Sequence, residues 1–141
     1  MDRFDSDAKR ALALAQNEAI RLNHNWLGTE HLMLGLLRDG GAMGAVLSSL
    51  GIDLSAARAA VERAVPRREK SPTEIPLTPR MHRVLARANQ LSPEPATQVT
   101  PQILLRALVA DPDGVGTQVL AELGATPERV REAVDRLTPP S

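Results

Sequence analysis

The second half of this chain repeats the first half. When the sequence is slid along itself until Leu12 meets Leu85, the apolar spacing around each of them agrees. In the middle the best offset is smaller by two, so that residues 29–32 meet residues 100–103 and one loop of the second half is shorter. Each half carries four helical patterns, and neither can bury its apolar face alone. We therefore predict an eight-helix domain with pseudo-twofold symmetry.

The amino-acid usage supports an all-α fold. Ala and Leu dominate the 141 residues, and β-branched residues are sparse, a mixture that favours helices. A chain of this length can bury about two-thirds of its unfolded surface, so a single domain can hold a core without disulfides, which the absence of Cys excludes.

Three Thr-Pro pairs predict helix starts in the second half, because Thr is a good N-cap and Pro is accepted at the first helical position. They begin at Thr78, Thr100 and Thr126. Five further helices follow from apolar spacing and stop signals. We expect them from a cap at Asp5 or Ser6 to about Leu22, from a cap at Thr29 to about Arg38, from Ala42 to Leu50, from about Leu54 to Val65, and from about Val115 to Leu123.

The helix after Thr29 is expected to lie at the centre of the domain. Leu32, Met33, Leu36 and Leu37 follow one another at helical spacing, and Leu34 makes the helix apolar nearly all round. A helix of this kind must be surrounded by other helices. Within its first turn Glu30 is expected to interact favourably with the helix dipole.

Charge and composition exclude several classes of function. Seventeen basic residues balance seventeen acidic ones, and there is one Trp, one Phe and no Tyr, so no general attraction to nucleic acid or stacking platform is expected. No apolar stretch reaches membrane-spanning length, and the N-terminus lacks the apolar region of a signal peptide. We expect a cytoplasmic protein. No phosphate-binding G-x-x-x-x-G-K-[ST] motif occurs, so this chain is not itself an ATPase.

Two alternatives rest on small groups of side chains. Glu30, His31 and His24 suggest a hydrolase or metal site. However, neighbouring helical residues point about 100° apart, so local hydrogen bonding of both histidines and no metal or catalytic site are expected. A nucleic-acid interface would rest on the row Arg80, Arg83 and Arg87, which we interpret as a solvated face.

The sequence resembles the Clp repeat, or Clp N-terminal, domain of ClpC-type AAA+ unfoldases. The resemblance is carried by Gly-Thr-Glu-His at residues 28–31 with its continuation to residue 36, and by residues 3–4, 13–16, 23–25, 47–51 and 75–80. It covers nearly the whole chain. It implies one domain over residues 1–141, with a first four-helix repeat at about 1–65, a linker at about 66–76 and a second repeat at about 77–138.

The resemblance also implies a function. Such domains dock substrates and adaptor proteins, and some bind phosphorylated arginine in two pseudo-equivalent pockets, where a Glu receives the guanidinium and groups near a helix start receive the phosphate. Glu30 matches that Glu, whereas its repeat counterpart is Pro101. The usual Thr is Asp5 in the first half and Thr78 in the second. We therefore expect each half to retain one part of a pocket, with phosphoarginine bound weakly at no more than one site.

In some relatives a surface between the repeats binds cyclic peptide antibiotics through aromatic residues. Met1 and Leu77 stand at those places here, so weakened antibiotic binding is expected, while Phe4 and Leu77 can simply close the apolar seam between the repeats. The candidate partner-binding residues are Glu30, Asp5, Phe4, Met1, Leu77, Thr78 and Arg80.

The resemblance predicts a protein-binding domain that docks substrates or adaptors for a Clp-type ATP-dependent unfoldase or protease. The alternative is a stand-alone Clp repeat protein that acts as a decoy or adaptor. No cofactor is expected, and neither nucleic acid nor a membrane is an expected partner.

Overall fold

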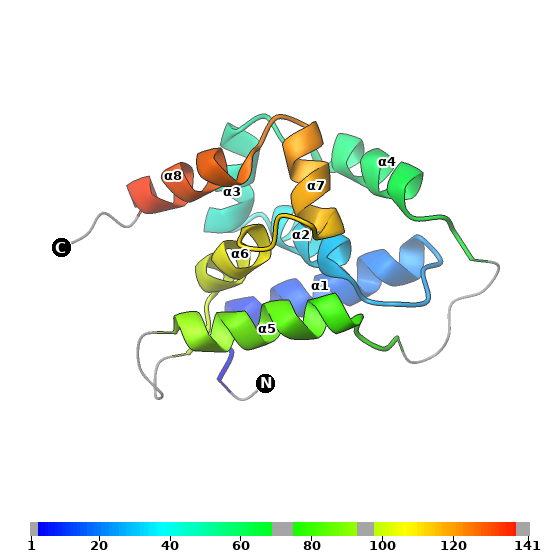
Figure 1. The fold of residues 1–141 in the computed structure, drawn as a ribbon, viewed down its shortest axis with the longest axis horizontal. Coiled ribbons are helices and arrows are strands. Elements are labelled where there is room, and N and C mark those ends of the chain that lie inside the picture. Colours follow the sequence, from blue (N-terminus) through cyan, green and yellow to red (C-terminus); the bar gives the residue numbers. More distant parts are fainter. Residues whose placement is uncertain (1–2, 69–74, 93–97, 138–141) are drawn as a thin grey trace.

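The computed structural model describes residues 3–68, 75–92 and 98–137, which form eight helices and no named strand (Figure 1). The first repeat contains α1 (Ser6–Arg21), α2 (Thr29–Asp39), α3 (Ala42–Ser49) and α4 (Leu54–Ala64). The second contains α5 (Pro79–Leu91), α6 (Pro101–Val109), α7 (Val115–Glu122) and α8 (Pro127–Leu137). The predicted all-α, eight-helix fold is confirmed. Met1 and part of the predicted linker lie outside the described residues.

The predicted caps explain where most helices begin. Asp5 caps α1 by accepting a hydrogen bond from the Ala8 backbone N–H at 2.7 Å. Thr78, Thr100 and Thr126 cap the later helices by accepting backbone N–H groups three residues ahead, at 3.0, 3.3 and 3.3 Å. Each cap satisfies a donor that the helix itself leaves without a partner.

The predicted cap at Thr29 is wrong. The N-cap of α2 is Gly28, and Thr29 is the first helical residue. The Thr29 hydroxyl instead accepts a hydrogen bond from the backbone N–H of Gly116, at the start of α7, at 3.1 Å. At the start of α2 the local contact is made by His31, whose Nδ1 accepts the Gly28 N–H at 2.9 Å. The Thr29 hydroxyl therefore has a long-range partner in place of the expected local one.

Helix α2 is the centre of the fold, as its apolar sequence predicts. Every residue from Thr29 to Leu37 is buried, and α2 contacts α1, α3, α4, α5, α6 and α7. The close approach of α1 depends on Gly35, where an added Cβ would collide with the Ala11 carbonyl and stand 2.8 Å from the Ala15 nitrogen. The buried alanines of α1 make the same approach possible from the other side.

The two repeats pack against each other reciprocally. Helix α2 corresponds to α6, α3 to α7 and α4 to α8. The contact of α2 with α7 is therefore repeated as the contact of α6 with α3, and the contact of α4 with α7 is repeated as the contact of α8 with α3. The segments that precede the helices also pair across the two repeats. The segment before α1 pairs with the segment before α6, through Phe4 and Val99. The segment before α2 pairs with the segment before α5, through Leu27 and Leu77. Each repeat therefore covers helix faces and pairs with backbone segments of the other repeat.

Among the described residues, no single helix is both long and apolar enough to cross a membrane. Of the described helices, only α3 and α4 taken together have the length and apolar composition of a membrane span, and they meet at an angle of 83°.

Candidate ligand-binding pockets

Glu30 and Thr78 line one pocket of about 190 Å³, which we call the Glu30 pocket. It lies where the segment before α2 pairs with the segment before α5, held by hydrogen bonds from Leu27 N to Pro76 O at 2.9 Å and from Thr78 N to Leu27 O at 3.0 Å. The other lining residues are His24, Asn25, Trp26, His31, Val65, Pro66 and Arg68. The pocket thus combines a carboxyl, a hydroxyl at a helix start and an arginine.

The carboxyl of Glu30 is buried without a cation. Its residue is 7% exposed, and no ion pair to it occurs among the described residues. Burial raises the pKa of Glu30, and a hydrogen bond from its own backbone N–H offsets this only in part. A side chain at position 28 would collide with this carboxyl, so Gly28 leaves the room it needs. A bound guanidinium would compensate the buried charge.

In the wall of the pocket, His24 and His31 form a buried relay of hydrogen bonds. His31 Nδ1 accepts the Gly28 N–H, so the neutral His31 ring carries its proton on Nε2 and donates it to His24 Nδ1 at 2.7 Å. His24 Nε2 then donates to the Val65 carbonyl at 3.1 Å. The predicted local hydrogen bonding is confirmed for His31 with Gly28 and for His24 with His31, whereas the bond from His24 to Val65 spans 41 residues. Burial lowers the pKa of both, that of His31 to about 3 with a further contribution from His24.

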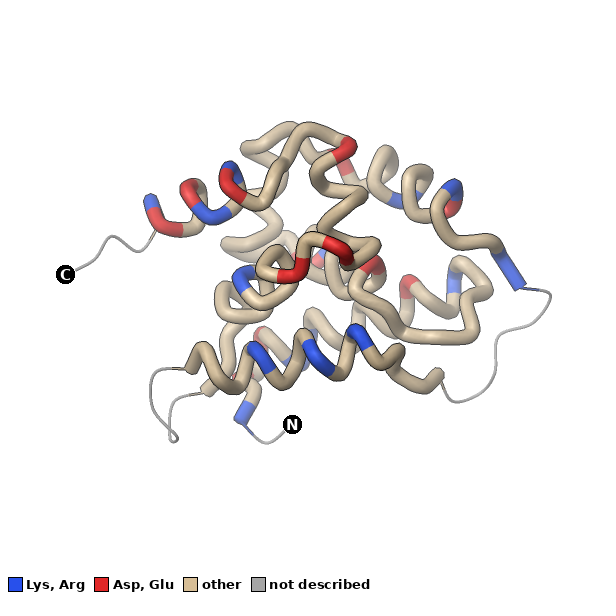
Figure 2. The backbone as a smooth tube through the Cα atoms, in the orientation of Figure 1, with Lys and Arg blue, Asp and Glu red and all other residues tan. Residues whose placement is uncertain are grey.

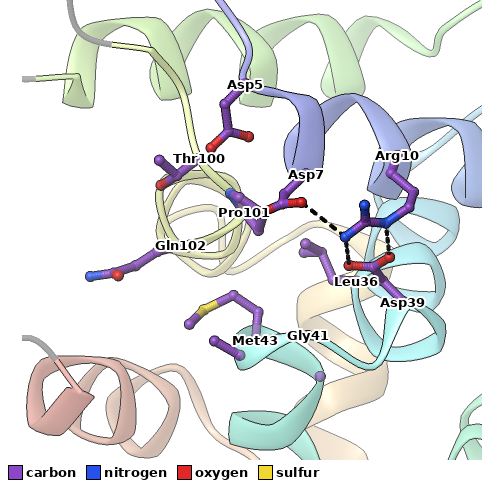
Figure 3. Close-up of a pocket in the computed structure, with 12 residues that line it drawn as sticks. Asp5, Asp7, Arg10, Leu36, Asp39, Gly41, Met43, Thr100, Pro101 and Gln102 are labelled. Atoms are coloured by element: carbon purple, nitrogen blue, oxygen red, sulfur yellow. Dashed lines mark hydrogen bonds and ion pairs between the residues drawn. The ribbon is translucent and has the colours of Figure 1, made fainter.

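The pseudo-equivalent place, where the start of α1 lies near the start of α6, forms the Asp5 pocket, of about 280 Å³. Figure 3 shows Asp5 and Asp7 at the start of α1, Pro101 at the start of α6 and Met43 in α3 around it. Arg10 does not stand free in this pocket, because it pairs with Asp7 at 2.9 Å and with Asp39 at 2.6 Å. The carboxylate of Asp5 already occupies the helix start.

The predicted grouping of the four key positions is therefore wrong. We expected Glu30 beside Asp5 and Thr78 beside Pro101, one pair in each repeat. The structure places Glu30 with Thr78 and Asp5 with Pro101, because the segments before the helices are exchanged between repeats. One pocket keeps both features of the implied phosphoarginine site, and the other has lost both. The predicted weakening of phosphoarginine binding assumed that these two features were separated, so it no longer follows.

Phe4, Leu77 and Arg80 line neither of these pockets. Phe4 is 2% exposed and belongs to the core, so its ring is not a surface contact. Leu77 is partly buried and lines a groove of about 390 Å³ between α1 and α5, with Leu12, Leu85 and Ile75. Met1 lies outside the described residues. Arg80 lies on α5 and binds both carboxylate oxygens of Asp111, at 2.8 and 2.7 Å.

Sequence reasoning missed Arg68 and Trp26 as pocket residues. Arg68 follows α4 and is held by a hydrogen bond from its N–H to the Asn23 carbonyl at 2.8 Å, and Trp26 is 52% exposed. The signal available in the sequence was that Arg68 is basic, that Trp26 is aromatic, and that both lie outside the apolar pattern of the helices. In the part of the chain that the structure describes, no group of three His, Cys, Asp or Glu residues is arranged to hold a metal ion.

Comparison with known proteins agrees with this architecture. The family model described as the Clp repeat (R) N-terminal domain matches residues 3–96. The chain is 41% identical over 143 aligned residues to the chloroplastic chaperone protein ClpC of Pisum sativum, covering 96% of this chain and 15% of that protein. It is 40% identical to chloroplastic ClpC2 of Arabidopsis thaliana, with the same coverage. These matches confirm the predicted resemblance.

Solved structures show the same fold. The N-terminal domain of the chaperone ClpD from Arabidopsis thaliana superposes with a TM-score of 0.80 at 30% identity, covering 97% of this chain and 99% of that one. The Hsp104 N-terminal domain from Candida albicans superposes with a TM-score of 0.77 at 17% identity, covering 96% and 91%. The chain thus spans nearly the whole of these N-terminal domains and about 15% of the length of the curated relatives.

Proposed function

Because this chain belongs to the family of Clp repeat N-terminal domains, we propose that it docks substrate or adaptor proteins for a Clp-type ATP-dependent unfoldase. The matched relatives are named as chaperones and as ATP-binding subunits of Clp proteases. Since the chain spans only about 15% of their length, the ATP-driven activity is assigned to other parts of such proteins, and recognition is assigned to this domain.

One observation supports recognition at a defined place, namely the Glu30 pocket. Its buried carboxyl has no cation among the described residues, while Thr78, the start of α5 and Arg68 border the same space. A carboxylate suits a guanidinium, and a helix start with a nearby arginine suits a phosphate. We therefore propose that the domain binds phosphorylated arginine side chains at this pocket, as the family resemblance implies.

The Asp5 pocket is proposed not to bind phosphoarginine. Asp5 would repel a phosphate, because its carboxylate stands at the start of α1, where Thr78 places an uncharged hydroxyl at the start of α5. Pro101 offers no group that could hold a guanidinium. One site per domain is therefore expected, although the fold has two pseudo-equivalent places.

Isothermal titration calorimetry of the intact chain with phosphoarginine tests this proposal. We expect a stoichiometry near one, and unmodified arginine should bind much more weakly. Glu30→Gln should lower the affinity by about ten- to hundredfold, since losing a hydrogen bond to a charged group costs about 1.5–3 kcal/mol. Asp5→Asn makes the same acid-to-amide change in the other pocket and should leave the affinity unchanged.

A gain of binding would sharpen the result. Asp5→Thr combined with Pro101→Glu restores both features in the Asp5 pocket and should raise the stoichiometry from one to two. Two equivalent sites in the unmodified chain would contradict the proposal, as would an affinity that Glu30→Gln does not change while the melting curve shows a folded protein.

A further inference from the structure

Helix α5 presents a row of three arginines, of which the fold holds only Arg80 in an ion pair among the described residues. Arg80, Arg83 and Arg87 are spaced three and four residues apart, so they share one face of the helix, and Figure 2 shows basic positions on successive turns of α5. Arg83 and Arg87 are exposed, and neither has an ion pair within residues 3–68, 75–92 and 98–137. Two guanidinium groups are thus available on this surface.

A hollow lies beside this row. It measures about 460 Å³ and is bounded by α5 and by the turn that follows α6. We call it the α5 surface; besides the three arginines it is lined by Val84, Ala86, Gln90, Ala110, Asp111 and Pro112. Asp111 holds Arg80 through both carboxylate oxygens, so Arg80 is fixed in place while the other two guanidinium groups can meet a ligand. The floor between them offers small apolar contacts.

The first repeat treats the counterpart of Arg83 differently. The alignment that pairs Leu12 with Leu85 also pairs Arg10 with Arg83 and Asp7 with Arg80. Arg10 is bound internally by Asp7 and Asp39, and the surface around it is acidic. The same position of the same helical unit is therefore neutralised in one repeat and left cationic in the other.

We propose that the α5 surface docks an acidic segment of a partner protein, one that carries two carboxylates beside a small apolar side chain. Residues four apart on a helix are about 6 Å apart at Cβ, and side chains two apart on an extended strand have nearly the same spacing. Carboxylates at either spacing can each meet one guanidinium, in the bidentate geometry that arginine favours.

A protein segment fits this surface better than a nucleic acid. The chain has no net charge and no Tyr, and its one Trp lies at the Glu30 pocket, so the Tyr or Trp rings that form stacking platforms for bases are missing beside these arginines. The α5 surface shares no lining residue with the Glu30 pocket. The inference rests on the proposed function only in taking the ligand to be a protein, and the two sites can be tested separately.

Fluorescence anisotropy with labelled peptides tests the proposal on the intact chain. The probe is a ten-residue peptide with alternating Glu and Ala, and its partner probe has Gln in place of Glu. We expect the Glu peptide to bind, the Gln peptide to bind at least tenfold more weakly, and the affinity to fall as salt rises from 50 to 200 mM. Arg83→Gln with Arg87→Gln should weaken the Glu peptide by at least about tenfold.

Matched variants separate this surface from general charge and from the Glu30 pocket. Arg131→Gln with Arg136→Gln removes two exposed charges from α8 and should change the affinity less than twofold. Glu30→Gln should keep the acidic peptide bound even where phosphoarginine binding is lost. Unchanged binding in the Arg83 and Arg87 variant, equal binding of the Gln peptide, or tighter binding of an oligothymidine strand would each overturn the proposal.

Discussion

The two repeats share a fold but keep their polar groups in different places. In repeat one, Glu18 is fully buried on α1 and holds Arg58 of α4 at 2.8 Å and Arg38 of α2 at 3.0 Å. Its counterpart on the equivalent helix of repeat two is Leu91, which is 43% exposed. Repeat one therefore uses charge inside the molecule at a position where repeat two has none.

The central helices differ in the opposite sense, because here repeat two carries a charge where repeat one carries none. Gly35 lets α1 lie directly on α2, whereas the corresponding position of α6 is Arg106, which reaches Asp135 of α8. The two copies of this duplicated unit thus differ in where they place charged side chains. Repeat two, in which Arg83 and Arg87 are exposed, is the copy that carries a candidate docking face.

The largest effect is expected when the repeats are separated. A fragment covering residues 1–65 should lose cooperative thermal unfolding completely, because α2 and α3 would expose the surfaces that pack on α6, α7 and α8 and the remaining core would not offset chain entropy. Circular dichroism melts of this fragment and of the whole chain test the prediction. Matching cooperative transitions in both would show that repeat one folds alone.

The second-largest effect on stability is expected from the buried charge of Glu18 in repeat one. Glu18→Ala should destabilise the domain by about 3–5 kcal/mol, because two partly buried arginines lose their shared partner. Leu91→Ala, at the counterpart position, should cost less than about 1 kcal/mol since its side chain is largely exposed. Urea denaturation measures both. Similar losses would mean that the internal ion pairs do not distinguish the repeats.

The cores can be compared at one position of the central helices. Leu36 is 1% exposed, and the alignment that pairs residues 29–32 with residues 100–103 places Ala107 opposite it. Leu36→Ala makes repeat one resemble repeat two there and should cost about 2–5 kcal/mol, because a cavity opens beneath helices that cannot collapse onto it. A loss below about 1 kcal/mol in chemical denaturation would mean that α2 is not the centre of the core.

The histidine relay, present only in repeat one among the described residues, predicts a smaller dependence on pH. Folding lowers the pKa of His31 to about 3, so the unfolded chain takes up a proton below about pH 6.5 that the folded chain does not. Stability should fall by about 1.5 kcal/mol between pH 6.5 and 5 from His31 alone. His24 acts in the same sense, whereas Glu30, whose pKa is raised by burial, acts in the opposite sense.

Comparing variants isolates the relay. His31→Gln should be less stable at neutral pH and should lose part of the fall in stability toward pH 5, as measured by urea denaturation at each pH. His82→Gln removes an exposed imidazole on α5, outside the relay, and should retain the fall. An unchanged slope in His31→Gln would show that this histidine does not cause it.

Much of the fold followed from the residues. Three Thr-Pro pairs marked helix starts correctly because a cap and its N–H partner are only three residues apart, within reach of local sequence. The apolar residues of α2 predicted its central place, since a helix without a polar face must be surrounded. The exception was Thr29, whose hydroxyl accepts the N–H of Gly116, 87 residues away, a partner that no local pattern encodes.

The candidate site was predicted residue by residue but not as a set. Glu30, Thr78, Asp5 and Pro101 were each singled out by their position in a repeat, and all four line pockets. Their grouping was wrong because a repeat in sequence was taken as a unit in space. Arg68 was missed, since nothing in its surroundings along the chain indicates that the end of α4 returns to the start of α2.

The sequence by itself determined the helices, their order, the duplication and the identity of the central element, because these depend on side chains within a few residues of one another. Only the tertiary structure decided which helix starts share a pocket. The pairing of Leu27 with Leu77 and of Phe4 with Val99 is made by backbone hydrogen bonds, for which every residue offers a carbonyl and every residue except Pro offers an N–H. Such bonds leave no mark in the sequence, so the exchange that joins Glu30 to Thr78 is visible only in the folded chain.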